Sequence, residues 1–372
     1  LHAPHNHAVF AWTHTKADVR TGGQVAEGNV RASHKYALQV TPVSDESHRQ
    51  ESFTYMSIPR SGKGKPGYSH DDGAEFADVA NMTMSWSTFL YSEDVWLEVS
   101  LLDGAEINSL SDVTIRPTTL NFELTLVDSS TLRIRVPHAD SGQRFSVEFD
   151  HEMVTSYSDQ SGVSGRLSED AQGSAIHSEP RNALLIFAEP TLNTAQRDEL
   201  IPADDGNIHY VDPGSINDLH EVRSEIIVFP AGTYYFPADY HAYLAEEVRW
   251  VYLAPGAYVK GALEFRGEQQ HYKVTGYGVL SGERYVYEAD RSTEHGHTAY
   301  THRSDLASDC HGSCVKMLQF WSSGTDQQLT VHGVTINEPP YHSFVVFGSE
   351  SQFLCLWLSL KNLIMHQILL NR

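Results

Sequence analysis

The stretch Trp-Val-Tyr-Leu-Ala-Pro-Gly-Ala-Tyr-Val-Lys-Gly-Ala-Leu-Glu-Phe, residues 250–265, determines how the rest of the chain is interpreted. After a polar corner the pattern resumes over 273–283 as Lys-Val-Thr-Gly-Tyr-Gly-Val-Leu-Ser-Gly-Glu. Both segments contain short apolar runs that are rich in β-branched and aromatic residues and are interrupted by glycine. Such runs are typical of strands separated by tight turns, so they predict strands rather than a helix.

The same pattern recurs along the chain at a nearly constant spacing. Phe229-Pro-Ala-Gly-Thr-Tyr-Tyr aligns with Leu253-Ala-Pro-Gly-Ala-Tyr-Val at an offset of 24 residues, and Gly261 aligns with Gly282 at an offset of 21. The run 329–336, Leu-Thr-Val-His-Gly-Val-Thr-Ile, fits as a further repeat. Repeats of this length indicate a solenoid, because one unit cannot bury its apolar face until a neighbour stacks on it. On the repeats alone, adjacent strands of an ordinary sheet remain the alternative.

Length and composition indicate a folded chain of two domains. The 372 residues exceed what one hydrophobic core usually occupies, and 40% are hydrophobic and 20% charged. The formal net charge is -22 at pH 7, from 26 Lys and Arg against 48 Asp and Glu. Such a surface repels phosphate backbones and anionic lipids, so we expect no nucleic acid or membrane partner. The 21 histidines would offset this charge in a mildly acidic medium.

The first half of the chain predicts an antiparallel β-sandwich. Short strand patterns with turn residues between them follow one another from 36 to 188, without a helical pattern. In the run 144–149, Arg-Phe-Ser-Val-Glu-Phe, alternation places Phe145, Val147 and Phe149 on one side. The polar segment 193–224 follows and contains Pro202 and Pro213, so we expect a linker there.

Cysteines and histidines gather in one polar segment, but their spacing does not define a site. Cys310 and Cys314 lie four residues apart, so a local disulfide is compatible with the sequence, and so is its absence. Neighbouring residues fit neither a Cys-x-x-Cys pair nor a His-Glu-x-x-His helix: His295, His297, His302 and His311. We therefore expect a solvated histidine-rich loop and no metal.

Paired carboxylates are the candidates for acid and base chemistry. Glycoside hydrolysis uses one carboxyl group as acid and a second as base or nucleophile. The available sets are Asp71 with Asp72, Asp204 with Asp205, and Glu283 with Asp290. The spacing alone selects none of these sets, and adjacent acids in loops are usually solvated.

Three further features concern processing and location. Asn81-Met-Thr is an N-glycosylation sequon, which is consistent with secretion. The chain opens at Leu1 without a methionine or an apolar signal region, so we expect a mature or partial product. The apolar C-terminal run contains Lys361 and His366, which makes it a poor membrane span.

A series of motifs carries a resemblance through roughly residues 9–343. The most specific are Trp250-Val-Tyr-Leu-Ala-Pro-Gly-Ala-Tyr-Val-Lys-Gly-Ala and Gly278-Val-Leu-Ser-Gly-Glu followed by Tyr285-Val-Tyr. The others are Gly28-Asn-Val-Arg with Ser33, Ser52-Phe-Thr-Tyr, Ser57-Ile-Pro-Arg, Trp86-Ser-Thr-Phe-Leu-Tyr-Ser, Val113-Thr-Ile-Arg-Pro-Thr, Arg144-Phe-Ser-Val-Glu-Phe, Asn182-Ala-Leu-Leu-Ile-Phe-Ala, and Gly333-Val-Thr-Ile-Asn with Pro339-Pro340. Together they resemble the fungal dextranase and isopullulanase group, glycoside hydrolase family 49.

The resemblance implies an all-β fold, with an N-terminal antiparallel β-sandwich followed by a right-handed parallel β-helix that is incomplete in this chain. It implies secretion, a monomer, and endo-acting, inverting hydrolysis of an α-glucan without a cofactor or metal. The substrate would be dextran or pullulan, and dextran is favoured. The expected division is 1–192 for the sandwich, 193–224 for a linker, 225–344 for the start of the β-helix and 345–372 for a divergent apolar tail.

The chain departs from the family where the chemistry is expected. The resemblance places the catalytic aspartates in later coils, in Thr-Asp-Gly and Asp-Asp type motifs beyond the Pro-Pro segment, but no Asp or Glu follows Glu350. We therefore assign no catalytic residue and expect an inactive, truncated chain, which a frameshift or retained intron would explain. Trp321, Tyr341 and His342 are the candidates for sugar binding, because aromatic faces suit sugar rings.

Three alternatives remain open. Isopullulanase activity on pullulan differs from dextranase only in the linkage that is cleaved. A noncatalytic glucan-binding fragment would bind dextran without releasing reducing ends. A polysaccharide lyase on the same type of solenoid would take acidic sugars, which the acidic composition disfavours.

Overall fold

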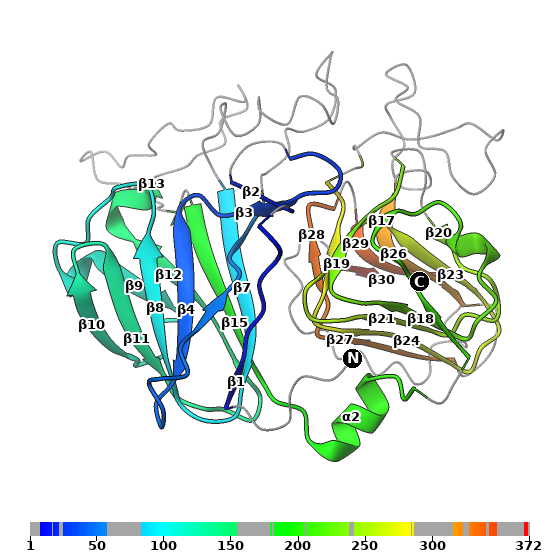
Figure 1. Ribbon diagram of the computed structural model, residues 1–372, viewed down its shortest axis with the longest axis horizontal. Coiled ribbons are helices and arrows are strands. Elements are labelled where there is room, and N and C mark those ends of the chain that lie inside the picture. Colours follow the sequence, from blue (N-terminus) through cyan, green and yellow to red (C-terminus); the bar gives the residue numbers. More distant parts are fainter. Residues whose placement is uncertain are drawn as a thin grey trace, which may run out of the picture.

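A computed structural model shows two β-domains side by side (Figure 1). The structure describes residues 8–16, 18–21, 25–57, 83–154, 179–180, 182–204, 207–237, 242–283, 285, 315–322, 327–339, 342–347 and 368–370. The N-terminal domain is a β-sandwich, and the C-terminal domain is a stack of short parallel strands. Both domains were predicted from the sequence.

The sandwich packs an eight-stranded sheet against a five-stranded sheet. The larger sheet contains β1 (Val9–Phe10), β2 (Val19–Thr21), β3 (Val30–Ala32), β6 (Tyr55–Ser57), β7 (Thr83–Tyr91), β9 (Val113–Arg116), β12 (Gln143–Phe149) and β15 (Asn182–Pro190). The smaller sheet contains β4 (Tyr36–Pro42), β5 (Gln50–Ser52), β8 (Val95–Leu101), β10 (Glu123–Asp128) and β11 (Thr131–Val136). Alternating residues of both sheets meet in one core, as the pattern of β12 predicted: Phe145, Val147 and Phe149 are all buried.

Most pairs in the sandwich are antiparallel, but β7 and β15 are parallel neighbours over nine residue pairs, from Asn182 opposite Thr83 to Pro190 opposite Tyr91. The sequence analysis predicted only antiparallel pairing. Between these strands the chain contributes β8, β10 and β11 to the smaller sheet and β9 and β12 to the larger one. Short pieces complete the domain: β13 (Met153–Val154), β14 (Glu179–Pro180), and the 3-10 turns η2 (Leu110–Asp112) and η3 (Asp150–Glu152).

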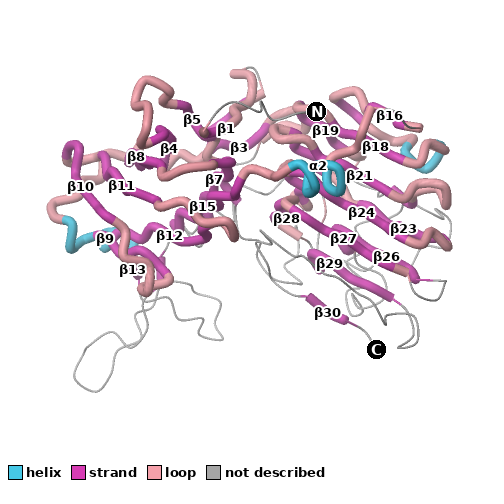
Figure 2. Tube along the Cα trace, turned by 90° about the horizontal axis from the view of Figure 1, so that it is seen from below, coloured by secondary structure: helices cyan, strands magenta, loops and turns pink. Residues whose placement is uncertain are grey.

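The C-terminal domain is a parallel β-helix with three faces, each a five-stranded parallel sheet. The first face contains β16 (Ile208–Tyr210), β18 (Ile226–Phe229), β21 (Trp250–Leu253), β24 (His271–Gly276) and β27 (Gln328–His332). The second contains β17 (Gly214–Ser215), β19 (Gly232–Tyr235), β22 (Ala257–Lys260), β25 (Val279–Ser281) and β28 (Thr335–Asn337). The third contains β20 (Ala242–Tyr243), β23 (Leu263–Gly267), β26 (Lys316–Ser322), β29 (His342–Phe347) and β30 (Ile368–Leu370). Figure 2 shows successive coils lying side by side.

The register confirms the repeat seen in the sequence. Phe229 pairs with Leu253, which is the predicted offset of 24 residues. On the second face Lys260 pairs with Ser281, the same offset of 21 that relates Gly261 to Gly282. Leu329 also stacks on a coil, opposite Tyr272. The solenoid interpretation was therefore correct, and the alternative of an ordinary sheet was not.

The predicted linker differs from the structure. The range 193–224, predicted as a linker, contains the helix α2 (Thr194–Leu200), the strands β16 and β17, and the turn η4 (Leu219–Glu221). Because β16 pairs with β18, the β-helix begins at Ile208. The divergent tail predicted from residue 345 stays a prediction: its first described residues belong to β29, from His342 to Phe347.

The helix α2 has a clear local cause. The Asn193 side chain accepts a bond from the Gln196 N–H, and the Gln196 side chain accepts one from the Asn193 N–H, which forms a reciprocal capping box. In the part of the chain that the structure describes, no helix has the length and apolar character needed to cross a bilayer.

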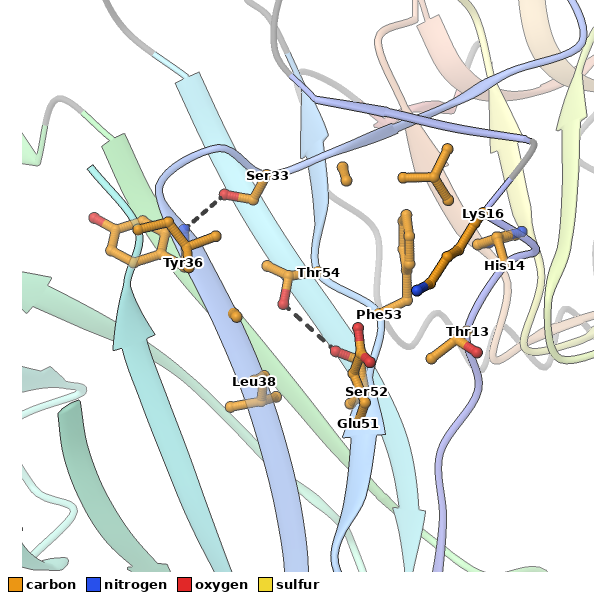
Figure 3. A pocket seen from close by; sticks show the side chains of 14 residues that line it. Thr13, His14, Lys16, Ser33, Tyr36, Leu38, Glu51, Ser52, Phe53 and Thr54 are labelled. Carbon is orange, nitrogen blue, oxygen red and sulfur yellow. Dashed lines mark hydrogen bonds between the residues drawn. The ribbon is translucent and has the colours of Figure 1, made fainter. Parts of the chain in front are cut away.

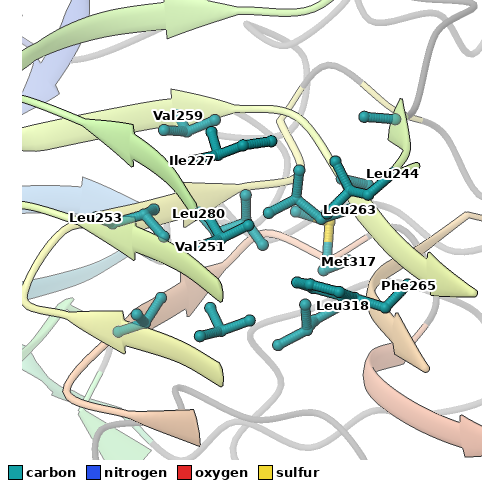
Figure 4. Packing of buried hydrophobic residues seen from close by; sticks show 14 of the residues in the cluster. Ile227, Leu244, Val251, Leu253, Val259, Leu263, Phe265, Leu280, Met317 and Leu318 are labelled. Carbon is teal, nitrogen blue, oxygen red and sulfur yellow. The ribbon is translucent and has the colours of Figure 1, made fainter. Parts of the chain in front are cut away.

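The interior of the β-helix is apolar and continuous from coil to coil. Inward side chains from the three faces meet in one cluster, including Val251 and Leu253, Val259, Leu280, and Leu263 with Leu318 (Figure 4). Each coil contributes only a few such residues, so the core exists only because the coils stack.

The second face of the β-helix packs against the sandwich. Tyr258 stacks on Tyr55 with ring centroids 5.8 Å apart, and Tyr55 stacks on Trp86 at 5.0 Å. Val279 joins the same cluster from the next coil. The Trp12 indole N–H donates to the Tyr55 hydroxyl at 3.2 Å, which satisfies a polar group inside this aromatic contact.

Close stacking predicts a severe effect of one glycine substitution. Gly276 has φ +117°, and a Cβ there would lie 1.9 Å from the Leu253 carbonyl oxygen. We expect Gly276→Ala to lower the free energy of unfolding by at least about 3 kcal/mol, because backbone strain and a backbone clash add. The control is Gly28→Ala, where a Cβ meets nothing within 4 Å. It should change stability by less than about 0.5 kcal/mol in urea unfolding. Equal unfolding midpoints for the two variants would contradict the coil register.

Candidate functional site

The third face of the β-helix carries a groove of about 580 Å³ where β23 ends. Six residues line it: Glu246, Arg266, Gly267, Glu268, Gln269 and Trp321. We call this the Trp321 groove. The Trp321 side chain is 40% exposed, although it belongs to β26, the central strand of its sheet. An indole left open to solvent beside polar side chains is typical of a ligand-binding surface.

Trp321 belongs to a stack of side chains that crosses neighbouring coils. The Phe347 ring lies parallel to the indole, with centroids 4.2 Å apart and an angle of 14°. On the other side the Arg266 guanidinium is 5.6 Å from the indole centroid but 4.2 Å from the Tyr243 ring. A hydrogen bond from Arg266 to the buried Glu264 carboxylate holds it there. One face of the indole is therefore covered and the other is only partly covered.

The structure separates two of the residues predicted to bind sugar. Trp321 is opposite Phe347 at one end of the strands, whereas His342 is opposite Lys316 at the other end. Five residues along a strand correspond to about 17 Å. His342 is also buried, at 2% exposure. They do not line one groove. Tyr341, Asn81, Cys310 and Cys314 lie outside the described residues.

Of the candidate carboxylates, the structure describes only Asp204 and Glu283. Asp204 is exposed and accepts a hydrogen bond from the Tyr210 hydroxyl at 2.8 Å. Glu283 is buried beside the sandwich. The remaining candidates, Asp71, Asp72, Asp205 and Asp290, lie outside the described residues, as do the histidines of the predicted polar loop. Among the described residues, no group of three His, Cys, Asp or Glu side chains could hold a metal ion.

Glu283 belongs to a buried set of charges between the two domains. We call it the junction cluster: Arg31, Tyr258, Lys260, Glu283 and Glu338. The Lys260 ammonium lies 2.5 Å from one Glu283 oxygen, and the Tyr258 hydroxyl donates to the other at 2.8 Å. Arg31, from the sandwich, lies 2.5 Å from a Glu338 oxygen of the β-helix. Glu338 is held at φ 46°, where non-glycine residues are uncommon.

Electrostatics keeps Glu283 ionised. Burial by itself would raise the pKa of this carboxyl group, but the charges of Lys260 and Arg31 and the hydrogen bonds of Lys260 and Tyr258 outweigh burial and lower the pKa to about 2. A general acid needs the opposite shift, toward a pKa near the working pH. Glu283 therefore serves as a structural counter-ion rather than as an acid.

A second cavity, of about 440 Å³, lies at the edge of the sandwich (Figure 3). Thr13, His14 and Lys16 of the N-terminal segment face Glu51 to Thr54 across it. Two of its hydroxyl groups are hydrogen-bonded within the sandwich: Ser33 accepts from the Tyr36 N–H at 3.0 Å, and Ser52 is bonded to the Ser87 hydroxyl at 2.7 Å. Burial lowers the pKa of His14 to about 4, and this ring is bonded to the Tyr55 hydroxyl at 2.9 Å. These groups hold the sandwich together, so the Trp321 groove is the better candidate for a ligand.

The junction cluster and most of the Trp321 groove were not predicted from the sequence. A lysine inside an apolar strand, Lys260, was a signal that a buried partner exists. No local signal joined Arg31 to Glu338, because 307 residues separate them. The groove combines Trp321 with a corner more than fifty residues upstream, which no local pattern reveals.

Comparison with known proteins identifies the family. The profile of the glycosyl hydrolase family 49 N-terminal Ig-like domain matches residues 2–191, which is the sandwich and slightly more than half of the chain. The chain belongs to glycosyl hydrolase family 49. The resemblance found in the sequence motifs is thereby confirmed, and so is the two-domain fold.

Relatives in this family come from both bacteria and fungi. The chain is 51% identical to a dextranase of Arthrobacter globiformis over 351 residues, which cover 94% of this chain and 54% of the relative. It is 35% identical to an isopullulanase of Aspergillus niger over 347 residues, covering 93% of this chain and 54% of that enzyme. The chain thus spans about half the length of these relatives, and the similarity is not confined to fungal enzymes.

A solved structure shares the whole described architecture. Dex49A from Penicillium minioluteum superimposes with a TM-score of 0.79 at 32% sequence identity. The match covers 96% of this chain and 63% of that chain. The sandwich and the first coils of the β-helix are therefore a shared framework.

The junction cluster predicts how stability depends on pH. The pKa of Glu283 is about 2 in the folded chain, below its ordinary value of 4.5, so its stabilising effect is present above pH 4.5 and is lost as pH falls toward 2. The difference corresponds to about 3 kcal/mol. We expect Glu283→Gln to be less stable than wild type at pH 7 and to show a flatter loss of stability between pH 5 and pH 2.

The control for this variant is Glu46→Gln, which removes an exposed ion pair with Arg133. It should change the free energy of unfolding by less than about 1 kcal/mol. The loss of stability between pH 5 and pH 2 should be the same as in wild type. Chemical unfolding at several pH values measures both variants. Parallel pH profiles for Glu283→Gln and wild type would contradict the assigned electrostatics.

Proposed function

We propose that the whole protein is a secreted endo-acting hydrolase that cleaves the α-1,6 bonds of dextran with inversion. The observation that supports this most directly is the 51% identity to a dextranase across 94% of the chain. The acidic net charge of -22 suits a neutral polysaccharide better than an anionic one. Secretion fits a polymer too large to enter cells, and the Asn81 sequon and a monomeric state belong to the same proposal.

Isopullulanase activity is the second candidate, because one relative carries that name at 35% identity. Dextran and pullulan differ in their linkages, so the two activities are separated by the substrate that yields reducing ends. A lyase would instead release unsaturated products that absorb ultraviolet light.

The test is hydrolysis by the whole protein at mildly acidic pH. We expect reducing ends from dextran at a rate well above that from pullulan, and products whose anomeric configuration is inverted when followed by NMR. Faster release from pullulan would favour the isopullulanase alternative. No release from either polymer by well-folded whole protein would refute the proposal.

The 372-residue chain alone is expected to release no reducing ends. The resemblance assigns the acid and base to Asp-containing motifs that are absent after Glu350. Glu283, the described member of the third carboxylate set, is fixed in an ion pair with Lys260.

A substitution in the whole protein separates a structural role of Glu283 from a catalytic one. We expect Glu283→Gln to change kcat by less than about tenfold at temperatures where the variant is folded, because loss of an acid or base costs about 10² to 10⁴. Steady-state rates on dextran measure this, with thermal unfolding as the check on folding. A loss of a thousandfold in folded protein would reassign Glu283 to the chemistry.

A further inference from the structure

We propose that the Trp321 groove is a glucan-binding site, in which a glucose unit of a neutral polysaccharide packs against the exposed part of the Trp321 indole. The proposal rests on the proposed function only for the choice of glucose polymer. The site lies on the third face of the β-helix, whereas the sandwich covers the second face. It would hold the polymer without taking part in bond cleavage.

The stack leaves part of the Trp321 indole exposed at the groove. The sheet order is β20, β23, β26, β29, so the coils of Arg266 and Phe347 lie on opposite sides of Trp321. Phe347 covers one face at 4.2 Å. The other face is turned toward the end of β23, which lines the groove. The Arg266 guanidinium lies over this face at 5.6 Å from the indole centroid and packs more closely on Tyr243, at 4.2 Å. A sugar ring would therefore contact the indole beside the guanidinium.

The corner opposite Trp321 is held in place before any ligand binds. The buried Gln327 amide donates to the carbonyl oxygens of Gly267, at 3.1 Å, and of Gln269, at 2.8 Å. The Tyr272 hydroxyl accepts from the Gln269 N–H at 3.2 Å. Gly267 adopts φ +147°, and a Cβ there would lie 2.9 Å from the Tyr272 oxygen. A fixed wall lowers the entropic cost of binding.

The polar lining selects the chemical class of the ligand. Glu246 and Glu268 are exposed carboxylates, which accept hydrogen bonds from sugar hydroxyls and repel uronic acids and phosphates. The Arg266 guanidinium is already engaged by Glu264 and Tyr243. An apolar ring face surrounded by hydroxyl groups, as in a glucose unit, matches an indole beside carboxylates.

Affinity electrophoresis of the 372-residue chain in gels with and without dextran tests the proposal. We expect dextran to retard the wild-type chain, and Trp321→Ala to weaken this retardation by at least about tenfold in apparent dissociation constant. The matched control is Trp96→Ala, which removes a half-buried indole of the sandwich that is covered by Arg133 at 4.3 Å. This control should bind dextran like wild type.

Trp321→Phe provides a second test if the alanine variant does not fold. It keeps an aromatic ring in the stack but removes the indole fluorescence. We expect dextran to change the tryptophan fluorescence of the wild-type chain and to have no such effect on Trp321→Phe. Wild-type chain that is not retarded, or a dextran-dependent fluorescence change that persists in Trp321→Phe, would overturn the proposal.

The outcomes separate this site from the proposed function. Dextran hydrolysis by the whole protein together with no retardation of the chain would refute the groove and leave the function intact. Retardation that requires Trp321, together with no hydrolysis by the whole protein, would support the groove and refute the function.

Discussion

The structure depends on the register with which each coil of the β-helix stacks on the previous one. A single coil buries too few side chains to be stable, so its apolar residues are covered only when the next coil lies directly upon it. The offsets of 24 residues on the first face and 21 on the second express this requirement in the sequence. Glycines such as Gly276 follow from it, because the turns must pass closely over the backbone below.

The sandwich packs against the second face of the β-helix. Its aromatic side chains cover the second face, where Tyr55 and Trp86 form a continuous stack with Tyr258. Charged side chains buried at this boundary are satisfied in pairs, Lys260 with Glu283 and Arg31 with Glu338. Breaking one such pair leaves an uncompensated buried charge, which is far more costly than loss of a surface pair. These buried contacts join the sandwich firmly to the β-helix.

Sequence analysis predicted the fold well because the fold is local. Alternation in strands such as β12 and the repeat around Trp250 are both visible within a few residues. The predicted linker failed because β16 and β17 are only three and two residues long, too short and polar for a periodic signal. The sites were predicted poorly, since the contacts that make them join distant segments. Trp321 was identified from the sequence as an aromatic candidate. Its separation from His342 and the groove around it depend on how distant segments pack, which the sequence pattern does not show.

The third face of the β-helix binds glucan, whereas the junction between the domains is structural. A crystal structure of the chain with a bound isomalto-oligosaccharide tests this claim most directly. We expect a glucose unit packed on Trp321, with hydroxyl groups directed to the corner 266–269. An oligosaccharide found instead against Glu283 or His342, with the Trp321 groove empty, would contradict it.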